Sequence, residues 1–392
     1  MLAALLALPG ALVSAAPADT WTLVAAAPAG VGTDPLFALT TNPENPALVL
    51  YATSSGEIYR SNDGGSNWSR VASGVGKGVF ALAFDPIEPT HVLAGTRAGG
   101  IWRSEDSGAT WRALDHGTEN VRGFAFSVGL SVAATDRGVM VTHDGDTWQP
   151  AGPEQASIAA VAVANGLVTA GAEVDPAVKG LPLFQSADSG ASWKQLSSLS
   201  GAGSAVSALG LAGTKLLVGT NTGLYASPDG GTSWSTLSSG VLPATDFTSV
   251  ATGDKSLYVA SDGGASANGG VWASGDGAQS FRSLNAPVPS VTAVALSQST
   301  LYVATFRPVD HRTFIWSYVD DGGPPQQPAA GTVPSPHPVS VAPAATSGKA
   351  ANGGQWYLAL LRGPELPYLA LGALAVLVLL LALIAYMRRG RA

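Results

Sequence analysis

The feature that most constrains this 392-residue chain is a short motif that recurs six times. Its first copy, SNDGGSNW, spans Ser61 to Trp68 and follows the pattern Ser-x-Asp-x-Gly-x-Ser/Thr-Trp. The other copies are SEDSGATW (104–111), THDGDTW (142–148), SADSGASW (186–193), SPDGGTSW (227–234) and SGDGAQSF (274–281). The motif aspartates are 38 to 47 residues apart. A period near 40 residues, made of short strands, predicts the blades of a β-propeller rather than a helical solenoid.

Each repeat unit contains four strand-like runs. In the second unit these runs are VFALAFDP, HVLAGTR, GIWRSED and WRALD, and turn residues separate them. Short β-rich runs bounded by Gly, Pro and Asp are typical of antiparallel strands. Residues 19–322 contain no long amphipathic helical pattern. We therefore expect an all-β domain over this range.

The blade count depends on the two ends of the repeat region. A seventh unit begins with VTAVALS at Val291 and stops at DDGG without its final Trp-containing strand. The segment DTWTLV, 19–24, resembles that missing end, and no other repeat unit precedes it. The sequence predicts a single seven-bladed β-propeller, closed by an N-terminal strand that becomes the outer strand of the last blade. Such closure hides free strand edges.

The motif resembles the Asp-box of the BNR-repeat propellers. That superfamily includes sialidases, the sortilin ectodomain, xyloglucan-cleaving glycoside hydrolases and photosystem II assembly factors. The resemblance covers nearly all of residues 19–322 and implies the fold. It says little about function, because one fold hosts unrelated activities. It also implies that the Asp-boxes lie on the face opposite the catalytic or binding face.

The chemistry of the motif also favours a structural role. Glycine permits a positive φ, aspartate accepts hydrogen bonds within its own turn, and tryptophan buries a large ring between blades. Calcium needs six or more oxygen ligands on one ion, and one aspartate per blade does not supply them. The predicted structural residues are Asp63, Trp68, Asp106, Trp111, Asp144, Trp148, Asp188, Trp193, Asp229, Trp234, Asp276 and Phe281.

Both ends of the chain carry membrane-targeting patterns. Residues 1–18 are apolar, end in small residues and predict a signal peptide cleaved after Ala15 or Ala18. Residues 367–387 are almost purely apolar and long enough for a transmembrane helix. The basic tail, 388–392, predicts a cytoplasmic C-terminus. The Pro/Ala/Gly-rich segment 323–366 is expected to be a disordered linker. We therefore expect a single-pass cell-membrane protein with its propeller outside.

Composition excludes several kinds of site. The chain has no cysteine, which rules out disulfides, thiolate metal sites and a cysteine nucleophile. Its net charge of −7 gives no basic footprint for nucleic acid. The five histidines are scattered without ligand spacing, and the glycine-rich stretches follow hairpin patterns. We expect no metal and no cofactor.

Function is expected in the non-repeating loops of the opposite face, which connect the second and third strands or neighbouring blades. Charged residues gather there in blades two, three and seven. The candidate binding residues are Arg97, His116, Glu119, Arg122, Asp136, Arg137, Arg307, His311 and Arg312. Among them, Arg97, Arg122 and Arg137 are compatible with the arginine-bearing face of the photosystem II assembly factors.

Evidence for catalysis is weak. FRPV at Phe306 resembles a sialidase element, but it stands in the last blade instead of ahead of the Asp-boxes. Where xyloglucan hydrolases carry an acid in a TDVGGAYR-like element, this chain reads TSSGEIYR, with Ser54 at the acid position and Glu57 nearby. The remaining candidate acids are Glu173, Asp175 and Asp310.

The leading hypothesis is a membrane-anchored, extracytoplasmic and non-enzymatic module that recognises or assembles a protein or glycan partner. One alternative is a glycoside hydrolase of the BNR superfamily, either exo-sialidase-like or xyloglucanase-like. Another is a structural envelope protein.

Overall fold

A computed structural model describes residues 19–26, 35–114, 119–154, 156–164, 166–173, 183–196, 205–237, 242–253, 256–263 and 268–321. All of them belong to one compact unit, Met1–Ala330. The predicted signal peptide, linker, transmembrane helix and basic tail lie outside the described residues. Within those residues, no helix is long and apolar enough to cross a membrane.

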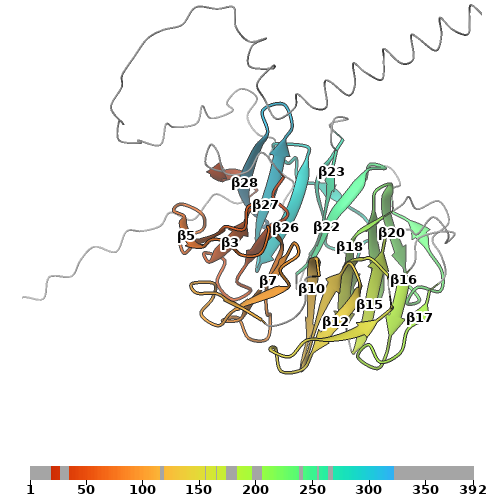
Figure 1. The fold of residues 1–392 in the computed structure, drawn as a ribbon. Coiled ribbons are helices and arrows are strands. Elements are labelled where there is room, and N and C mark those ends of the chain that lie inside the picture. Colours follow the sequence, from red (N-terminus) through yellow and green to blue (C-terminus); the bar gives the residue numbers. More distant parts are fainter. Residues whose placement is uncertain are drawn as a thin grey trace, which may run out of the picture. The chain divides into compact units, whose positions relative to one another are not determined.

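The described chain forms seven four-stranded antiparallel sheets, which are the blades of a propeller (Figure 1). Blades one to six each use four consecutive strands. Blade one contains β2 (Ala38–Thr41), β3 (Val49–Ala52), β4 (Ile58–Ser61) and β5 (Ser69–Ala72). Blade two contains β6 (Val79–Phe84), β7 (Val92–Thr96), β8 (Ile101–Ser104) and β9 (Arg112–Ala113). Blade three contains β10 (Val121–Ser127), β11 (Leu130–Thr135), β12 (Gly138–Thr142) and β13 (Gln149–Gly152).

The remaining blades follow the same plan. Blade four contains β14 (Ile158–Ala164), β15 (Leu167–Ala172), β16 (Leu183–Ser186) and β17 (Lys194–Gln195). Blade five contains β18 (Val206–Ala212), β19 (Lys215–Thr220), β20 (Gly223–Ser227) and β21 (Ser235–Thr236). Blade six contains β22 (Asp246–Thr252), β23 (Leu257–Asp262), β24 (Gly270–Ser274) and β25 (Arg282–Ser283). Blade seven contains β26 (Val291–Ser297), β27 (Thr300–Arg307), β28 (Arg312–Val319) and β1 (Thr22–Ala26).

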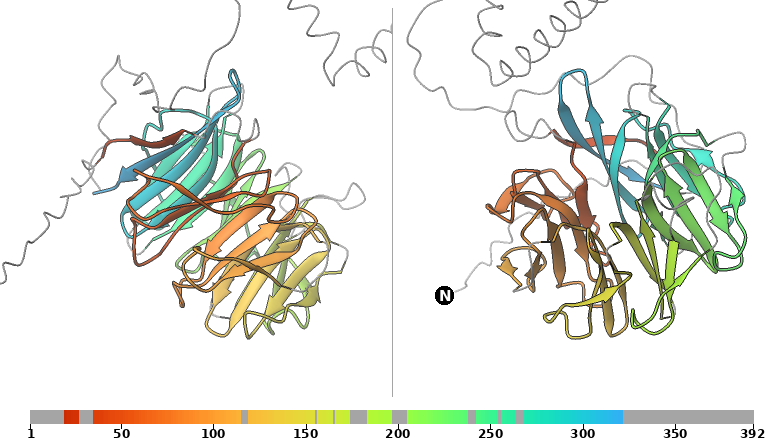
Figure 2. Two further views of the ribbon diagram at one scale, coloured as in Figure 1. Left: turned by 60° about the vertical axis from the view of Figure 1, so that its left-hand side comes forward. Right: turned by 45° about the vertical axis from the view of Figure 1, so that its right-hand side comes forward.

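Blade seven joins the two ends of the repeat region. Its strand order is β1-β28-β27-β26, so the first strand of the chain is the outer strand of the last blade. Thr22 pairs with Ser317 and Ala26 pairs with Phe314. Figure 2 shows the red strand β1 beside the blue strand β28. The seven-bladed all-β fold predicted from the repeats is confirmed, including its N-terminal closing strand.

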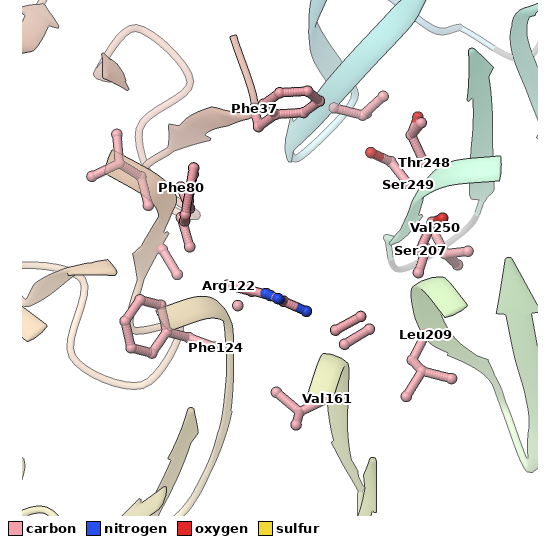
Figure 3. A pocket seen from close by; sticks show the side chains of 18 residues that line it. Phe37, Phe80, Arg122, Phe124, Val161, Ser207, Leu209, Thr248, Ser249 and Val250 are labelled. Atoms are coloured by element: carbon pink, nitrogen blue, oxygen red, sulfur yellow. The ribbon is translucent and has the colours of Figure 1, made fainter. Parts of the chain in front are cut away.

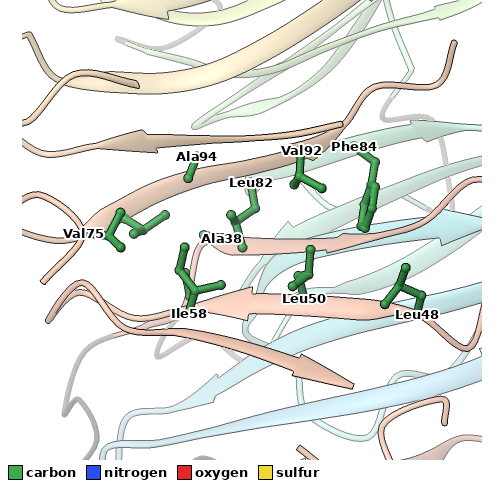
Figure 4. Close-up of a cluster of buried hydrophobic side chains, with 11 residues drawn as sticks. Ala38, Leu48, Leu50, Ile58, Val75, Leu82, Phe84, Val92 and Ala94 are labelled. Atoms are coloured by element: carbon green, nitrogen blue, oxygen red, sulfur yellow. The ribbon is translucent and has the colours of Figure 1, made fainter. Parts of the chain in front are cut away.

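The core is divided among the contacts between neighbouring blades. The described residues form seven buried apolar clusters, and each cluster joins residues of two adjacent blades. Between blades one and two, Leu50 and Ile58 face Leu82, Phe84 and Val92 (Figure 4). Stability is therefore spread around the ring instead of residing in one central core.

In six of the seven blades the second strand contributes to two of these clusters at once; β15 of blade four contributes to one. In β7, Val92 and Ala94 pack toward blade one, while Leu93 packs toward blade three. Successive side chains of a strand point to opposite faces of its sheet, and here both faces are covered by a neighbouring blade. This explains why the second strands read as continuous apolar runs without polar alternation.

The motif turns lie between the third and fourth strands. In blade one, the Ser61 hydroxyl and the Asn67 amide both donate to Asp63 Oδ1 at 2.8 Å. The Gly65 amide donates to Ser61 Oγ at 2.9 Å. Gly65 has a φ of 91°, and a β-carbon there would meet Val24 at 2.8 Å. Only glycine fits this position.

Hydrogen bonds also fix the face on which these turns lie. The Gly64 amide donates to Ala47 O at 2.9 Å, and the Ser107 amide donates to Thr90 O at 2.8 Å. Ala47 and Thr90 belong to loops between the first and second strands. The motif turns therefore share a face with those loops. The loops between second and third strands, and those between blades, lie on the other face, which is called the loop face below.

Candidate functional site at the mouth of the central channel

The innermost strands of the blades surround a cavity of about 270 Å³ (Figure 3). Most of its lining is small or apolar. Phe37, Phe80 and Phe124 supply aromatic rings, and Ser207 and Thr248 supply hydroxyl groups. Arg122 also lines the cavity, and Figure 3 shows its guanidinium extending into the open space.

A β-bulge near the start of the innermost strand recurs in six blades. In β6, Val79 pairs with Thr96 and Ala81 pairs with Gly95, which leaves Phe80 without a ladder partner. The bulged residues are Phe80, Arg122, Ala159, Ser207, Thr248 and Thr292. A bulge redirects its side chain away from the regular pleat. Here the bulges form a ring at the end of the channel that opens on the loop face, and Arg122 is its one charged member.

Four of the bulged side chains connect to the next blade. The Thr248 hydroxyl donates to Val291 O at 2.9 Å, and the Ser207 hydroxyl donates to Asp246 Oδ1 at 2.7 Å. The Thr292 hydroxyl donates to the Leu36 carbonyl. Arg122 Nη1 donates to Ser157 Oγ at 3.1 Å. The bulges therefore bind neighbouring blades to one another around the channel mouth.

Arg122 also forms an ion pair with Glu173 of blade four. The Nη1–Oε1 distance is 3.1 Å, and the two side chains are 28% and 51% exposed. The structure thus brings a predicted binding residue against a predicted catalytic acid. Asp175, the second candidate acid, lies outside the described residues. Glu173 is held by a cation on an open surface, where an ion pair of this kind contributes little stability.

A second group of predicted residues meets beside Arg122. Arg137 lies 3.6 Å from Glu119, and the Asn120 side chain donates to Asp136 Oδ2 at 2.7 Å. Asn120 Oδ1 accepts a hydrogen bond from the Ala98 amide at 3.0 Å.

The hydrogen bond between the Ala98 amide and Asn120 connects the loop that carries the exposed Arg97 to the loop before β10. His116 lies outside the described residues. The residues Arg97, Glu119, Arg122, Asp136, Arg137 and Glu173 are called the blade 2–4 patch below.

The predicted residues of blade seven form a separate cluster at the β27–β28 hairpin. Arg307 donates two hydrogen bonds to Asp310, at 2.8 and 2.5 Å, and lies 4.8 Å from the centre of the Phe314 ring. The hydrogen bond from Arg307 lowers the pKa of Asp310. His311 has a φ of 51°, and Arg312 is exposed. Glu173 follows β15 of blade four, whereas Asp310 lies in the β27–β28 hairpin of blade seven, and each is paired with a different arginine.

The sequence reasoning missed an acidic pair in blade six. Asp246 and Asp262 are ladder partners on β22 and β23. Burial raises the pKa of Asp246, and the charge of Asp262 raises it further, while the hydrogen bond from Ser207 opposes both effects. One signal in the sequence could have pointed to Asp246, because it is an aspartate at the start of the largely apolar run DFTSVA. Its pairing with Asp262 depends on the ladder register.

Comparisons with known proteins show the fold alone. No known family profile matches this sequence, and no curated protein matches it. Among solved structures, the chain is similar to the designed protein Ika8, with 16% identity and a TM-score of 0.50, over 74% of this chain and 98% of that one.

YCF48 from Cyanidioschyzon merolae matches with 15% identity and a TM-score of 0.56, over 76% of this chain and 98% of that one. The extracellular domain of the hybrid two-component system BT3049 from B. thetaiotaomicron matches with 14% identity and a TM-score of 0.55, over 72% of this chain and 40% of that one. These similarities agree with a propeller fold, while the resemblance to BNR repeats stays a prediction. In fold, the chain is a β-propeller.

Proposed function

We propose that this protein is a non-enzymatic recognition module that binds a protein partner through the blade 2–4 patch. The observation that carries the proposal is the presence of three arginines at the end of blades two and three that faces away from the motif turns, two on loops and Arg122 at the bulge of β10. Arg97 is exposed, the Arg137 side chain is 70% exposed, and Arg122 reaches the channel mouth. A planar guanidinium binds carboxylates with two parallel hydrogen bonds, which suits acidic side chains of a protein partner.

The arrangement of the candidate acids supports binding more than hydrolysis. A glycoside hydrolase sets two carboxyl groups roughly 5–10 Å apart across one bond. Glu173 and Asp310 lie on blades four and seven, and each is paired with an arginine. Exposed ion pairs are easily exchanged, so a partner's carboxylate could replace Glu173 on Arg122 at low cost.

In this proposal, the signal peptide and transmembrane helix expected from the sequence would put this patch outside the cell, in a protein anchored in the membrane. The linker 323–366 would give the propeller freedom to reach a partner on the same membrane. Among the structural neighbours, the BT3049 domain is itself an extracellular domain. In this proposal the partner is a protein of the cell envelope with an acidic surface.

The test is affinity capture from cross-linked membranes with the full-length chain. Changing Arg97, Arg122 and Arg137 together to Ala should reduce recovery of the captured partner by at least about tenfold, since interfacial arginines are frequent hot spots. A matched control changes Arg70, Arg112 and Lys194, which lie on fourth strands at the outer edge of the blades. Equal recovery by the two triple variants would overturn the proposal.

The acidic pair of blade six favours a second candidate, a glycoside hydrolase. A carboxyl group with a raised pKa beside a second carboxylate is the usual composition of an acid/base pair. In this candidate Asp246 is the general acid and Asp262 is the second carboxylate. Turnover of fluorogenic glycosides by the full-length protein, abolished by Asp246→Asn, would support it. No turnover by the unaltered protein would reject it.

A further inference from the structure

The ring of side chains at the channel mouth has a seventh member in blade one. The segment LFALTTNP, 36–43, matches VFALAFDP, 79–86, in its Phe-Ala-Leu and in its final proline. In both segments the alanine after the phenylalanine opens the uninterrupted part of the ladder. Phe37 therefore holds in blade one the position that Phe80 holds in blade two. In blade order the ring contains Phe37, Phe80, Arg122, Ala159, Ser207, Thr248 and Thr292.

The two sides of this ring differ in chemistry. Phe37 and Phe80 lie on one side of the open space (Figure 3). Ser207 and Thr248 lie on the other side, and the Arg122 guanidinium extends between the two. The Phe37 side chain is 53% exposed, although phenylalanine is among the residues most often buried. The mouth therefore offers apolar contacts and one positive charge to a molecule that enters it.

The Arg122 guanidinium keeps donors for such a molecule. Its contacts with Ser157 Oγ and Glu173 Oε1 both use Nη1, each at 3.1 Å. Within the described part of the chain, no residue accepts a hydrogen bond from Nε or Nη2. Two neighbouring guanidinium N–H groups bind a carboxylate with two parallel hydrogen bonds. Arg122 can therefore hold a carboxylate while its ion pair with Glu173 stays in place.

The surrounding groups decide which anion fits. The hydroxyl hydrogens of Ser207 and Thr248 are already donated to protein oxygens. Their oxygens can then only accept hydrogen bonds, and they give a carboxylate none. Glu173 repels a second negative charge near Arg122. The cavity of about 270 Å³ is nearly twice as large as one of about 150 Å³ that takes a benzene ring. A ring and a short chain that ends in one carboxylate meet all of these conditions.

We propose that the mouth of the central channel is a binding site for a small aromatic monocarboxylate. Its carboxylate accepts two hydrogen bonds from Nε and Nη2 of Arg122, and its ring packs against Phe37 and Phe80. Aromatic pairs favour offset or edge-to-face contacts, which an open mouth permits. The site takes only the Arg122 guanidinium from the blade 2–4 patch, so it goes beyond the proposed contact with a protein partner.

The first test compares 3-phenylpropionate with 3-phenylpropanamide, a neutral probe of nearly the same shape, by isothermal titration calorimetry. The full-length protein is held in nanodiscs, and empty nanodiscs give the background. The acid should bind at least about tenfold more tightly than the amide, because only the acid forms charge-assisted hydrogen bonds with Arg122.

Two matched substitutions show whether Arg122 is the cause. Arg122→Met should remove the difference between the acid and the amide. Arg137→Met makes the same change on the same face, outside the cavity lining, and should preserve the difference. Equal affinities of the unaltered protein for the two probes, no binding of the acid at millimolar concentrations, or equal effects of the two substitutions would overturn the proposal.

The second test locates the site without changing a charge. Ala159 lines the cavity, and Ala159→Phe should fill the mouth and weaken the binding of the acid severalfold. Ala113→Phe adds the same ring on the exposed strand β9 and should leave the affinity unchanged. Undiminished binding by a folded Ala159→Phe variant would overturn the proposal. Thermal melts followed by circular dichroism show which variants fold, and the arginine variants decide alone if Ala159→Phe does not. The capture experiment on the partner protein is independent of all these results.

Discussion

At the scale of residues, the motif aspartates act as turn caps. Asp106 accepts hydrogen bonds from the Ser104 hydroxyl at 2.8 Å, the Thr110 amide at 2.8 Å and the Thr110 hydroxyl at 2.6 Å. Its two oxygens thereby satisfy donors of a turn that has few backbone partners of its own. A carboxylate suits this position because it only accepts, whereas an asparagine would face some of these donors with its own amide group.

Asp106→Ala should lower the free energy of unfolding by about 1 kcal/mol, the usual effect of losing a capping side chain. Urea denaturation followed by circular dichroism would measure the change. Glu44→Ala removes an exposed carboxylate from a loop on the same face and should change stability by less than about 0.5 kcal/mol. A loss at Asp106 no larger than that at Glu44 would contradict the capping role.

At the scale of elements, the closing strand β1 decides whether the ring holds together. It pairs with β28 over four ladder positions, and Trp21 in front of it packs between blades six and seven. The bulged strands perform a related task at the channel mouth, where their side chains bond to the next blade. Closure therefore depends on a strand at the outer edge and on side chains at the centre.

Trp21→Ala should cost about 2–4 kcal/mol of unfolding free energy, because it removes a large packed ring and a hydrogen bond to Leu284. Hydrogen exchange should show lost protection in β28. Trp234→Ala is the matched control, since its indole N–H has no hydrogen-bond partner in the described structure. It should cost about 1 kcal/mol less than Trp21→Ala and loosen β20 instead. Unchanged protection of β28 in the Trp21 variant would contradict a closing role for β1.

At the scale of the whole molecule, the aspartate cap is repeated around the ring, so the contributions of the single caps to stability add. All six complete motifs contain an aspartate whose pKa is lowered by hydrogen bonds, to about 2 for Asp188 and Asp229. Each lowered pKa favours the folded state at any pH above the unfolded pKa of about 4. That contribution is lost as pH falls from about 4 through the folded pKa. Asp19 and Asp246, whose pKa values are raised, act in the opposite direction but are fewer.

Between pH 7 and pH 5 the motif aspartates stay ionised in both states, so they should change the midpoint of thermal unfolding little. Between about pH 4 and pH 2 the midpoint should fall steeply, because the aspartates are protonated there. Circular dichroism melts across this range would measure it. The Asp106→Ala variant should show a shallower fall than the unaltered protein, because one of the titrating groups is gone. A midpoint that stays constant from pH 5 to pH 2 would contradict the shared role of the motif.

The sequence by itself determined the blade number and the closing strand. Both follow from a motif whose spacing equals one blade, and from a last unit that lacks the strand which DTWTLV provides. Turn chemistry and strand periodicity are local properties, so they are legible in a linear sequence.

The site was decided only by the tertiary structure. The sequence indicated the charged loops, but the fold paired Arg122 with Glu173 and Arg307 with Asp310. The bulge at Arg122, the facing pair Asp246–Asp262 and the hydrogen bond from Tyr318 to Asp19 depend on ladder register and on contacts between blades. Residues far apart in the chain meet at these points, and no spacing in the sequence encodes which ones. The physical reason is that a propeller joins its blades through non-local packing, whereas each blade folds from a contiguous segment.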